Sequence, residues 1–227
     1  MPTDRVWLFD LDNTLHNASH AAFAGIGSSM NDYIVRELGL SAEDAAALRR
    51  RYWLRYGATL LGLVKHHAVN AAHFLHHTHV LPGLEAAVHG HAHDFAALKR
   101  LRGRKFILTN APRVYAHRVL DALGIGHWFD GVISIEDMRM FGELRPKPDA
   151  RMLRMLLARL GLRASRCVLV EDTLQHQKAA RRVGMKTVWM QRWARSGAGE
   201  ARTRWSMQPA YVDIKARRLR VLHQRRP

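Results

Sequence analysis

A chain of 227 residues, 48% of them hydrophobic, can bury one large core or a core with an inserted subdomain. No apolar run reaches the roughly 18 residues of a membrane span, and the first residues lack the zones of a signal peptide, so we expect a cytoplasmic protein with no membrane partner. The net charge of +17 favours anionic partners such as phosphate esters. Because no nucleic-acid-binding motif accompanies this charge, we expect no specific nucleic-acid partner.

Short apolar runs alternate with helical patterns along most of the chain. The apolar runs cover residues 6–9, 105–108, 131–135, 167–170 and 186–190. The helical patterns cover residues 115–123, 150–160 and 174–183, and Gly124 and Gly184 are expected to end the first and the last of them. This alternation predicts an α/β fold, a Rossmann-like parallel sheet with helices on both faces. The basic segment after the last run, residues 195–227, is expected to be a solvated tail.

The gap between the first and second apolar runs indicates an insertion. Residues 10–104 fill it, although a crossover between parallel strands needs only about a dozen residues. Apolar residues at helical spacing occupy residues 20–38, 41–56, 60–66 and 71–79, and Ser41 followed by Asp44 predicts the start of the second helix. We therefore expect a core domain from residues 1–15 and 96–227 and a helical domain inserted at residues 16–95.

Nine of the fifteen histidines lie between His66 and His93. His73 and His77 stand one helical turn apart, a spacing that can chelate zinc. No cysteine and no acid in helical register accompany them, so we interpret the segment as a histidine-rich solvent face.

Polar side chains follow three of the predicted strands. They are Asp10 and Asp12 after the first run, Thr109 and Asn110 after the second, and Glu171 and Asp172 after the fourth. The carboxyl ends of parallel strands meet at one edge of the sheet, where ligands bind. Carboxylates gathered there would repel one another by roughly several kcal/mol. A bound hard divalent cation such as Mg²⁺ ordinarily reduces this repulsion. Lys147, which lies between two prolines, and the Thr109 hydroxyl would suit a phosphate.

Four motifs stand in order along the chain. They are Asp10-Leu11-Asp12-Asn13-Thr14, Leu108-Thr109-Asn110, Lys147 and Glu171-Asp172. Each alone is also typical of an ordinary turn or helix start, but the four together at strand ends resemble those of the haloacid dehalogenase superfamily. The resemblance covers almost the whole chain, and it implies that the inserted helical domain is a cap domain.

Three further stretches resemble the pyrimidine 5′-nucleotidase branch of this superfamily. They are residues 9–15 followed by Ser19, residues 56–63 and residues 107–111. Two positions depart from it, since His16 stands where that branch has tyrosine and His176 stands where many relatives have asparagine. The resemblance implies a small phosphorylated substrate, specifically a pyrimidine nucleoside 5′-monophosphate, and it leaves the oligomeric state open.

The same resemblance implies a hydrolysis through an aspartyl-phosphate, with Asp10 as the nucleophile and Asp12 as the acid and base. Two carboxylates are needed because the nucleophile must be ionised while the acid must hold a proton. The resemblance also implies that Asp10, the backbone carbonyl of Asp12 and Asp172 hold Mg²⁺, with Glu171 acting through water or by supporting the residues that bind the ion. The groups expected to hold the phosphoryl oxygens are Thr109, the Asn110 amide and Lys147.

Three other functions are compatible with parts of this pattern. A phosphatase or phosphomutase acting on a sugar phosphate or another small ester would use the same residues. A dehalogenase would share the nucleophile, but its relatives lack an acid at the position of Asp12. A catalytically silent protein that binds a nucleotide or RNA would explain the charge, although the intact Asp10, Lys147 and Asp172 argue against it.

Overall fold

The structure, a computed structural model, describes residues 5–193 and 208–224. The chain divides into two compact units, one formed by residues 1–18 and 88–227 and the other by Ser19–Ala87. We call them the sheet unit and the helical unit. The second segment of the sheet unit begins at Val88 rather than at residue 96, and helix α7 (Ala92–Arg100) lies within it. Asp94 of this helix accepts a hydrogen bond from the backbone N–H of Leu219 (2.8 Å), which ties α7 to the end of the described chain.

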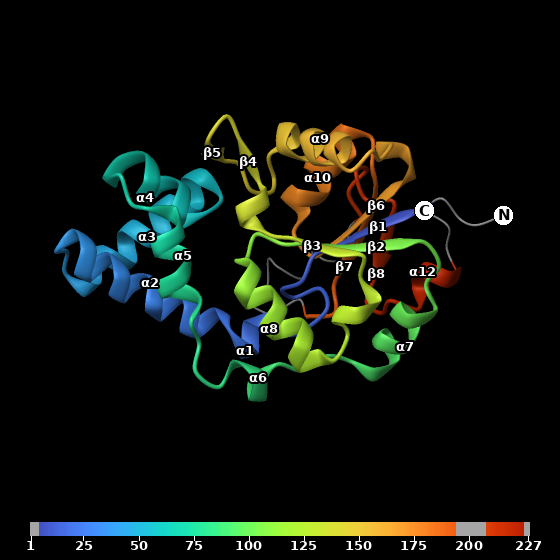
Figure 1. Ribbon diagram of the computed structural model, residues 1–227, viewed down its shortest axis with the longest axis horizontal. Coiled ribbons are helices and arrows are strands. Elements are labelled where there is room, and N and C mark those ends of the chain that lie inside the picture. The colour runs from blue at the N-terminus through green and yellow to red at the C-terminus, as the bar shows by residue number, and fades with distance from the viewer. Residues whose placement is uncertain (1–4, 194–207, 225–227) are drawn as a thin grey trace. The chain divides into compact units, whose positions relative to one another are not determined.

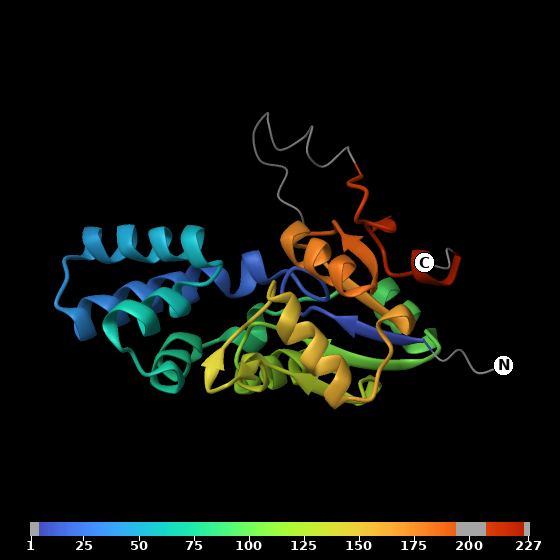
Figure 2. The ribbon, with the colours of Figure 1, turned by 90° about the horizontal axis from the view of Figure 1, so that it is seen from above.

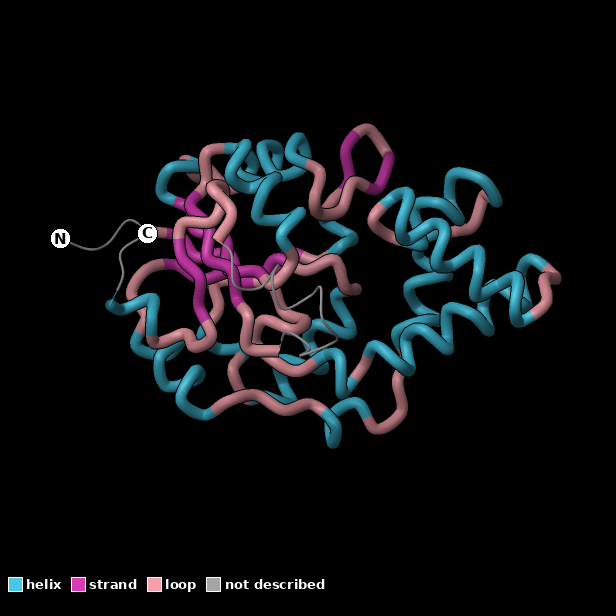
Figure 3. Tube along the Cα trace, turned by 180° about the vertical axis from the view of Figure 1, so that it is seen from behind, coloured by secondary structure: helices cyan, strands magenta, loops and turns pink. Residues whose placement is uncertain are grey.

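A six-stranded parallel sheet forms the centre of the sheet unit (Figures 1 and 3). Its strands are β1 (Val6–Phe9), β2 (Arg104–Leu108), β3 (Gly131–Ile133), β6 (Cys167–Glu171), β7 (Lys186–Met190) and β8 (Ile214–Ala216). The spatial order is β3-β2-β1-β6-β7-β8, and Leu8 of β1 pairs with Phe106 on one side and Leu169 on the other. The predicted α/β fold with a parallel sheet is confirmed, and β1 lies between the two strands that carry the other predicted site residues.

The last part of the chain differs from the prediction. Residues 208–224 are not a solvated tail, because Ile214–Ala216 forms strand β8 beside β7 and α12 (Val221–Gln224) follows it. The Asp213 carboxylate accepts hydrogen bonds from the backbone N–H and the hydroxyl of Thr187, which fixes the start of this pairing. The rest of the expected tail, residues 195–207 and 225–227, lies outside the described residues.

Helices cover both faces of the sheet (Figure 1). Helices α9 (Ala150–Arg159) and α10 (Leu174–Val183) pack on one face, and α7 and α8 (Arg113–Leu123) lie on the other. Gly124 and Gly184 end α8 and α10 in the left-handed conformation (φ 66° and 94°), as the sequence predicts. The remaining short elements are the hairpin strands β4 (Arg139–Met140) and β5 (Glu143–Leu144) and the 3₁₀ helices Gly126–Trp128, Ile135–Asp137 and Ala164–Arg166.

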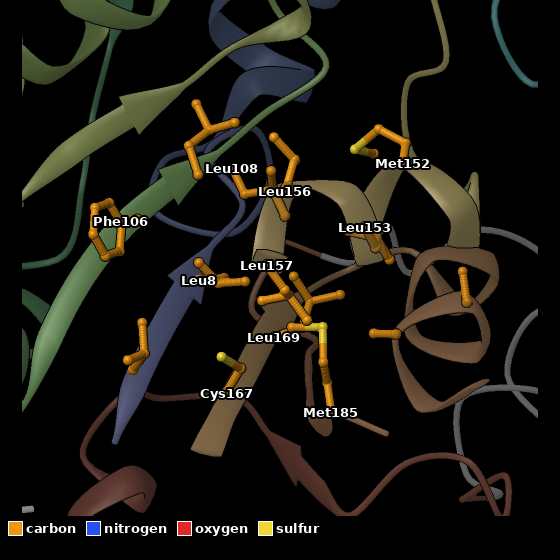
Figure 4. Close-up of a cluster of buried hydrophobic side chains, with 14 of the residues drawn as sticks. Leu8, Phe106, Leu108, Met152, Leu153, Leu156, Leu157, Cys167, Leu169 and Met185 are labelled. Atoms are coloured by element: carbon orange, nitrogen blue, oxygen red, sulfur yellow. The ribbon is translucent and has the colours of Figure 1, made fainter. Parts of the chain in front are cut away.

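The alternation of side chains along the strands builds the two halves of the core. Figure 4 shows the half under α9 and α10, where Leu8, Phe106 and Leu169 meet the leucines of α9. Neighbours in sequence point the other way, and the Phe9 ring meets the Phe129 ring edge to face with centroids 6.0 Å apart. Cys167 is buried in this core and takes no part in the site.

The helical unit is built from packed helices joined by short turns (Figure 2). They are α2 (Phe23–Leu38), α3 (Ala42–Tyr56), α4 (Thr59–His67), α5 (Ala71–His79) and α6 (Leu84–Ala87), preceded by α1 (Ala18–Ala21) at the unit's edge. The Ser41 hydroxyl accepts a hydrogen bond from the backbone N–H of Asp44 (3.1 Å), so α3 begins where the sequence predicts. Gly62 packs so closely on Tyr52 that a Cβ there would lie 2.2 Å from the tyrosine ring.

Three histidines of the helical unit, His66, His67 and His73, form hydrogen bonds with tyrosines. Tyr33 bonds to His73 (2.9 Å) and Tyr52 bonds to His67 (2.8 Å), while the rings of His73 and His77 meet with centroids 4.3 Å apart. Among the described residues, no third metal-ligating side chain joins His73 and His77. Within the same ranges, no helix combines the length and the apolarity needed to cross a bilayer.

Candidate active site

The predicted site residues of the sheet unit meet at the carboxyl ends of β2, β1 and β6. Asp10 directly follows β1, Thr109 and Asn110 follow β2, and Glu171 ends β6. Backbone bonds continue past the strands and fix this edge, since Asp10 donates to the Val170 carbonyl (2.9 Å). The fifth residue, Lys147, comes from the loop between β5 and α9. Parallel strands with adjacent ends thus gather residues that lie up to 162 positions apart, from Asp10 to Asp172.

Lys147 is a buried cation at the centre of the site. Its Nζ donates to Asp10 Oδ1 (2.8 Å), to Glu171 Oε2 (2.7 Å) and to the Leu108 carbonyl (2.7 Å). The three ammonium hydrogens therefore have three acceptors. Burial by itself lowers the pKa of Lys147, but the carboxylates of Asp10 and Glu171 outweigh burial and raise it above its usual range. Lys147 is charged at every physiological pH.

Asn110 holds the loop that carries Lys147. Its side-chain amide donates to the Lys147 carbonyl (2.9 Å), and its side-chain oxygen accepts the Lys147 backbone N–H (2.9 Å). This reciprocal pair fixes the lysine backbone to the end of β2. Asp149 continues the arrangement by accepting the backbone N–H groups of Arg151 and Met152, so helix α9 starts directly after the loop. Nothing in the sequence signals this role of Asn110, because it depends on a contact between two loops.

Three carboxylates cluster around the lysine. Asp10, Glu171 and Asp172 each offer an oxygen, and these oxygens lie within 4.8 Å of one another. Burial, followed by the Glu171 charge, raises the pKa of Asp10 to about 7. Burial and the charges of Glu171 and Asp10 raise the pKa of Asp172 to about 10. Although burial opposes ionisation of Glu171, the charges of Lys147 and His176 hold its pKa well below its usual range.

These carboxylates suit a hard divalent cation. Oxygen donors are the ligands that Mg²⁺ prefers, and the raised pKa values report repulsion that a cation would relieve. The three carboxylates with Lys147 carry a formal charge of −2, which matches one divalent ion. The side chain of Asp12 does not belong to this cluster.

Asp12 has a separate environment. Its Oδ1 accepts a hydrogen bond from the Tyr115 hydroxyl (2.8 Å) and lies 2.9 Å from Nε2 of the fully buried His16. Burial and the Asp12 charge raise the pKa of Tyr115, so its hydroxyl stays protonated and donates. Both contacts fall on one oxygen and hold the carboxylate in a fixed orientation. His16, a departure from the resemblance, therefore supports Asp12. Tyr115, in the first turn of α8, carried no signal in the sequence because its contact with Asp12 joins segments 103 positions apart.

His176 and Thr109 complete the surroundings. Nδ1 of His176, the other departure, lies 2.9 Å from Glu171 Oε2, so it supports the same oxygen that Lys147 holds. The other Glu171 oxygen accepts the backbone N–H of Thr173 (3.0 Å). The buried Thr109 hydroxyl accepts the backbone N–H of Ala111 (3.0 Å), which fixes its position at the end of β2.

A family model for haloacid dehalogenase-like hydrolases matches residues 5–184. The chain belongs to this family. The matched range includes all four motifs and the inserted helical unit, so the predicted superfamily is confirmed. Solved structures of the family have the same fold. A haloacid dehalogenase phosphatase from Thermococcus onnurineus superposes with a TM-score of 0.62 at 20% identity over 97% of this chain and 96% of that chain.

Several named proteins resemble the chain in sequence. Phosphate metabolism protein 8 of Saccharomyces cerevisiae is 25% identical over 201 residues, 81% of this chain and 60% of that protein. Validoxylamine A 7′-phosphate phosphatase of Streptomyces hygroscopicus subsp. limoneus is 28% identical over 191 residues, 80% of this chain and 83% of that protein. Pyrophosphatase PpaX of Bacillus velezensis is 30% identical over 51% of this chain, and the match spans 49% of that protein.

The carboxylate cluster predicts that Mg²⁺ binding depends on pH. The pKa values of Asp10 and Asp172 lie above the value of about 3.9 expected in an unfolded chain. Without metal, the folded state therefore loses stability as pH rises from about 3.9, up to about 7 because of Asp10 and up to about 10 because of Asp172. Mg²⁺ displaces the protons and removes this penalty. We expect the rise in melting temperature caused by MgCl₂ to be larger near pH 8 than near pH 6.

Thermal melts of the purified protein with chelator or with MgCl₂ measure this difference, at constant ionic strength. Asp172→Asn removes one carboxylate from the cluster and should reduce the Mg²⁺ effect at both pH values. Asp121→Asn, an exposed acid on α8, is the control and should behave as wild type. An Mg²⁺ effect of equal size at both pH values would contradict the assignment of the cluster as the metal site.

Proposed function

We propose that this chain is a Mg²⁺-dependent phosphomonoester hydrolase that works through an aspartyl-phosphate intermediate. The observation that carries the proposal is the buried Asp10 carboxylate, held by Lys147 on one oxygen within a cluster of three acids. The relatives named as phosphatases support the same reaction class. The substrate enters as a dianionic ester, and the site offers Lys147, the backbone of the strand ends and a divalent cation to balance its charge.

Asp10 forms the new bond in the first step. Lys147 fixes Asp10 Oδ1, which leaves the second oxygen to attack phosphorus. The bond from phosphorus to the ester oxygen breaks, its electron pair goes to that oxygen, and Asp12 gives it a proton. Mg²⁺, when bound by Asp10, Asp172 and the backbone carbonyl of Asp12, reduces the repulsion between the two anions. Glu171 acts indirectly, since Lys147 and His176 both hold it.

Asp12 acts again in the second step. It takes a proton from a water that attacks phosphorus, and the bond between phosphorus and Asp10 breaks to release inorganic phosphate. Tyr115 and His16 keep the Asp12 carboxylate in place for both transfers. The Thr109 hydroxyl and the backbone N–H of Asn110 contribute hydrogen bonds to the phosphoryl oxygens. Because the three donors of Lys147 already have acceptors, this lysine contributes its charge and its hold on Asp10.

The nucleophile is tested by Asp10→Asn. An amide is a poor nucleophile but still offers an oxygen to Lys147, so we expect the protein to fold and hydrolysis to fall by on the order of 10⁴-fold or more. Phosphate release from a generic aryl phosphate with Mg²⁺ measures the loss, and melting curves check the fold. Asp121→Asn serves again as the matched control. Substantial turnover by folded Asp10→Asn would refute the covalent mechanism.

The role of Asp12 is tested with two leaving groups. Asp12→Asn cannot donate a proton, so hydrolysis of a nucleoside or sugar phosphate should fall far more than hydrolysis of an activated aryl phosphate, whose leaving group needs little protonation. Tyr115→Phe keeps the carboxylate and removes one hydrogen bond, so a smaller loss with the same leaving-group dependence is expected. Equal losses on both substrates would count against Asp12 as the general acid.

The substrate class is proposed as pyrimidine nucleoside 5′-monophosphates. The support is the resemblance of residues 9–15, 56–63 and 107–111 to the nucleotidase branch. Within the helical unit, Leu60, Gly62 and Leu63 of α4 are buried, whereas Gly57 is exposed and Tyr56, Ala58 and Leu61 are half-buried, so these four residues are the parts of that segment accessible to a substrate. A second candidate is a sugar phosphate or a similar ester, which the match to validoxylamine A 7′-phosphate phosphatase over 83% of that protein favours.

A substrate panel separates these candidates. We expect kcat/KM for UMP and CMP to exceed that for AMP and GMP, because a site matched to one ring excludes two rings by steric conflict. Sugar phosphates belong in the same panel, with product analysis to distinguish hydrolysis from phosphate migration. A preference for purines or for sugar phosphates would end the nucleotidase assignment and leave the phosphatase assignment intact. The cytoplasmic location and the lack of a nucleic-acid partner stay predictions from the sequence.

A further inference from the structure

A cavity lined largely by arginines lies at the opposite edge of the sheet from the catalytic residues. Its volume is about 750 Å³, within the usual range for small-molecule sites. Its lining comes from the loops that precede β1, β2, β3 and β6. Strand β1 runs from right to left in Figure 2; Arg5, which lines the cavity, directly precedes this strand, and Asp10 directly follows it. With a rise of about 3.3 Å per residue, Arg5 at the cavity and Asp10 at the site lie roughly 16 Å apart.

The charge of this cavity is strongly unbalanced. Five of its lining residues are arginines and one is an acid: Arg5, Arg102, Arg104, Arg163, Arg166 and Asp130. The carboxylate of Asp130 accepts the backbone N–H of Lys105 (2.7 Å), and its other oxygen lies 4.0 Å from Nε of Arg104. One carboxylate therefore lines a cavity to which five arginines contribute, and arginine cannot lose its proton to reduce the excess of positive charge. An anion of several charges would reduce it.

Several features prepare the arginines for an anion. The Arg104 guanidinium lies over the Phe106 ring (4.9 Å from Cζ to the centroid), a contact that restricts this side chain. Guanidinium N–H donors can bind phosphate in pairs. Gly103, at φ 103°, lets the loop approach β1 so closely that a Cβ would lie 2.3 Å from the Arg5 carbonyl oxygen.

We propose that this arginine cavity is a binding site for a linear polyphosphate anion, of the kind found in inorganic tripolyphosphate and in nucleoside triphosphates. A single phosphate carries too little charge to meet five arginines, and the cavity is large enough for a chain of several phosphates. The site is separate from the catalytic residues, and the proposal does not depend on the reaction proposed above. The protein's overall charge would attract polyanions to any surface, so the test must distinguish this cavity from general attraction.

The test is calorimetric titration of the full chain with sodium tripolyphosphate, in buffer with a chelator and at constant ionic strength. The double variant Arg102→Ala/Arg163→Ala removes two exposed arginines of the cavity. The matched control, Arg50→Ala/Arg51→Ala, removes two exposed arginines from α3 in the helical unit and so lowers the net charge by the same amount. We expect the cavity variant to bind at least roughly tenfold more weakly and the control to bind within about twofold of wild type.

Further titrants identify the source of the phosphate chain. ATP that binds as tightly as tripolyphosphate indicates recognition of the phosphate chain alone, and tighter binding of ATP indicates that the nucleoside contributes; both results support the site. Sulfate that binds as tightly as tripolyphosphate, or equal losses in the two double variants, would overturn the proposal by showing general charge attraction. Both variants should keep wild-type melting behaviour and wild-type phosphate release, so a failure of the catalytic proposal would appear separately.

Discussion

The contact of the Lys147 ammonium with Asp10 and Glu171 is the interaction on which the catalytic edge depends. Burying one ammonium without partners costs several kcal/mol, and burying two carboxylates without a cation costs more. Here the ammonium offsets one unit of the carboxylate charge, with donor–acceptor distances of 2.7–2.8 Å. Removing the lysine would leave both carboxylates buried without a cation. The arrangement also leaves one Asp10 oxygen for chemistry, because the lysine occupies the other.

The surrounding residues divide between holding this centre and acting on a substrate. Asn110 fixes the backbone of Lys147, and His176 supports the oxygen of Glu171 that Lys147 also contacts. Asp12 stands apart, with Tyr115 and His16 on one of its oxygens. The two carboxylates that the mechanism needs therefore have different environments. Asp10 lies among acids and near a lysine, whereas Asp12 lies beside a tyrosine hydroxyl and an imidazole, and this difference suits a nucleophile and a proton carrier.

The two edges of the parallel sheet carry opposite charge. Carboxylates gather at the carboxyl ends of β1 and β6, and arginines gather in the loops that precede the same strands. Because every strand runs in the same direction, the residues before and after each strand are sorted to opposite edges. Each edge thus concentrates one sign of charge from segments far apart in the sequence, and a cation suits one edge and a polyphosphate the other.

The sequence by itself determined the parallel sheet, the inserted helices and the residues that follow β1, β2 and β6, because these depend on local periodicity and on the rule that strand ends meet. Only the tertiary structure decided that Asn110 clamps Lys147, that Tyr115 and His16 hold Asp12, and that Ile214–Ala216 joins the sheet edge as β8. Each of these rests on contacts between segments distant in the chain. A three-residue strand or a tyrosine within a helix has no local signal, and its role is fixed by which neighbour the fold brings to it.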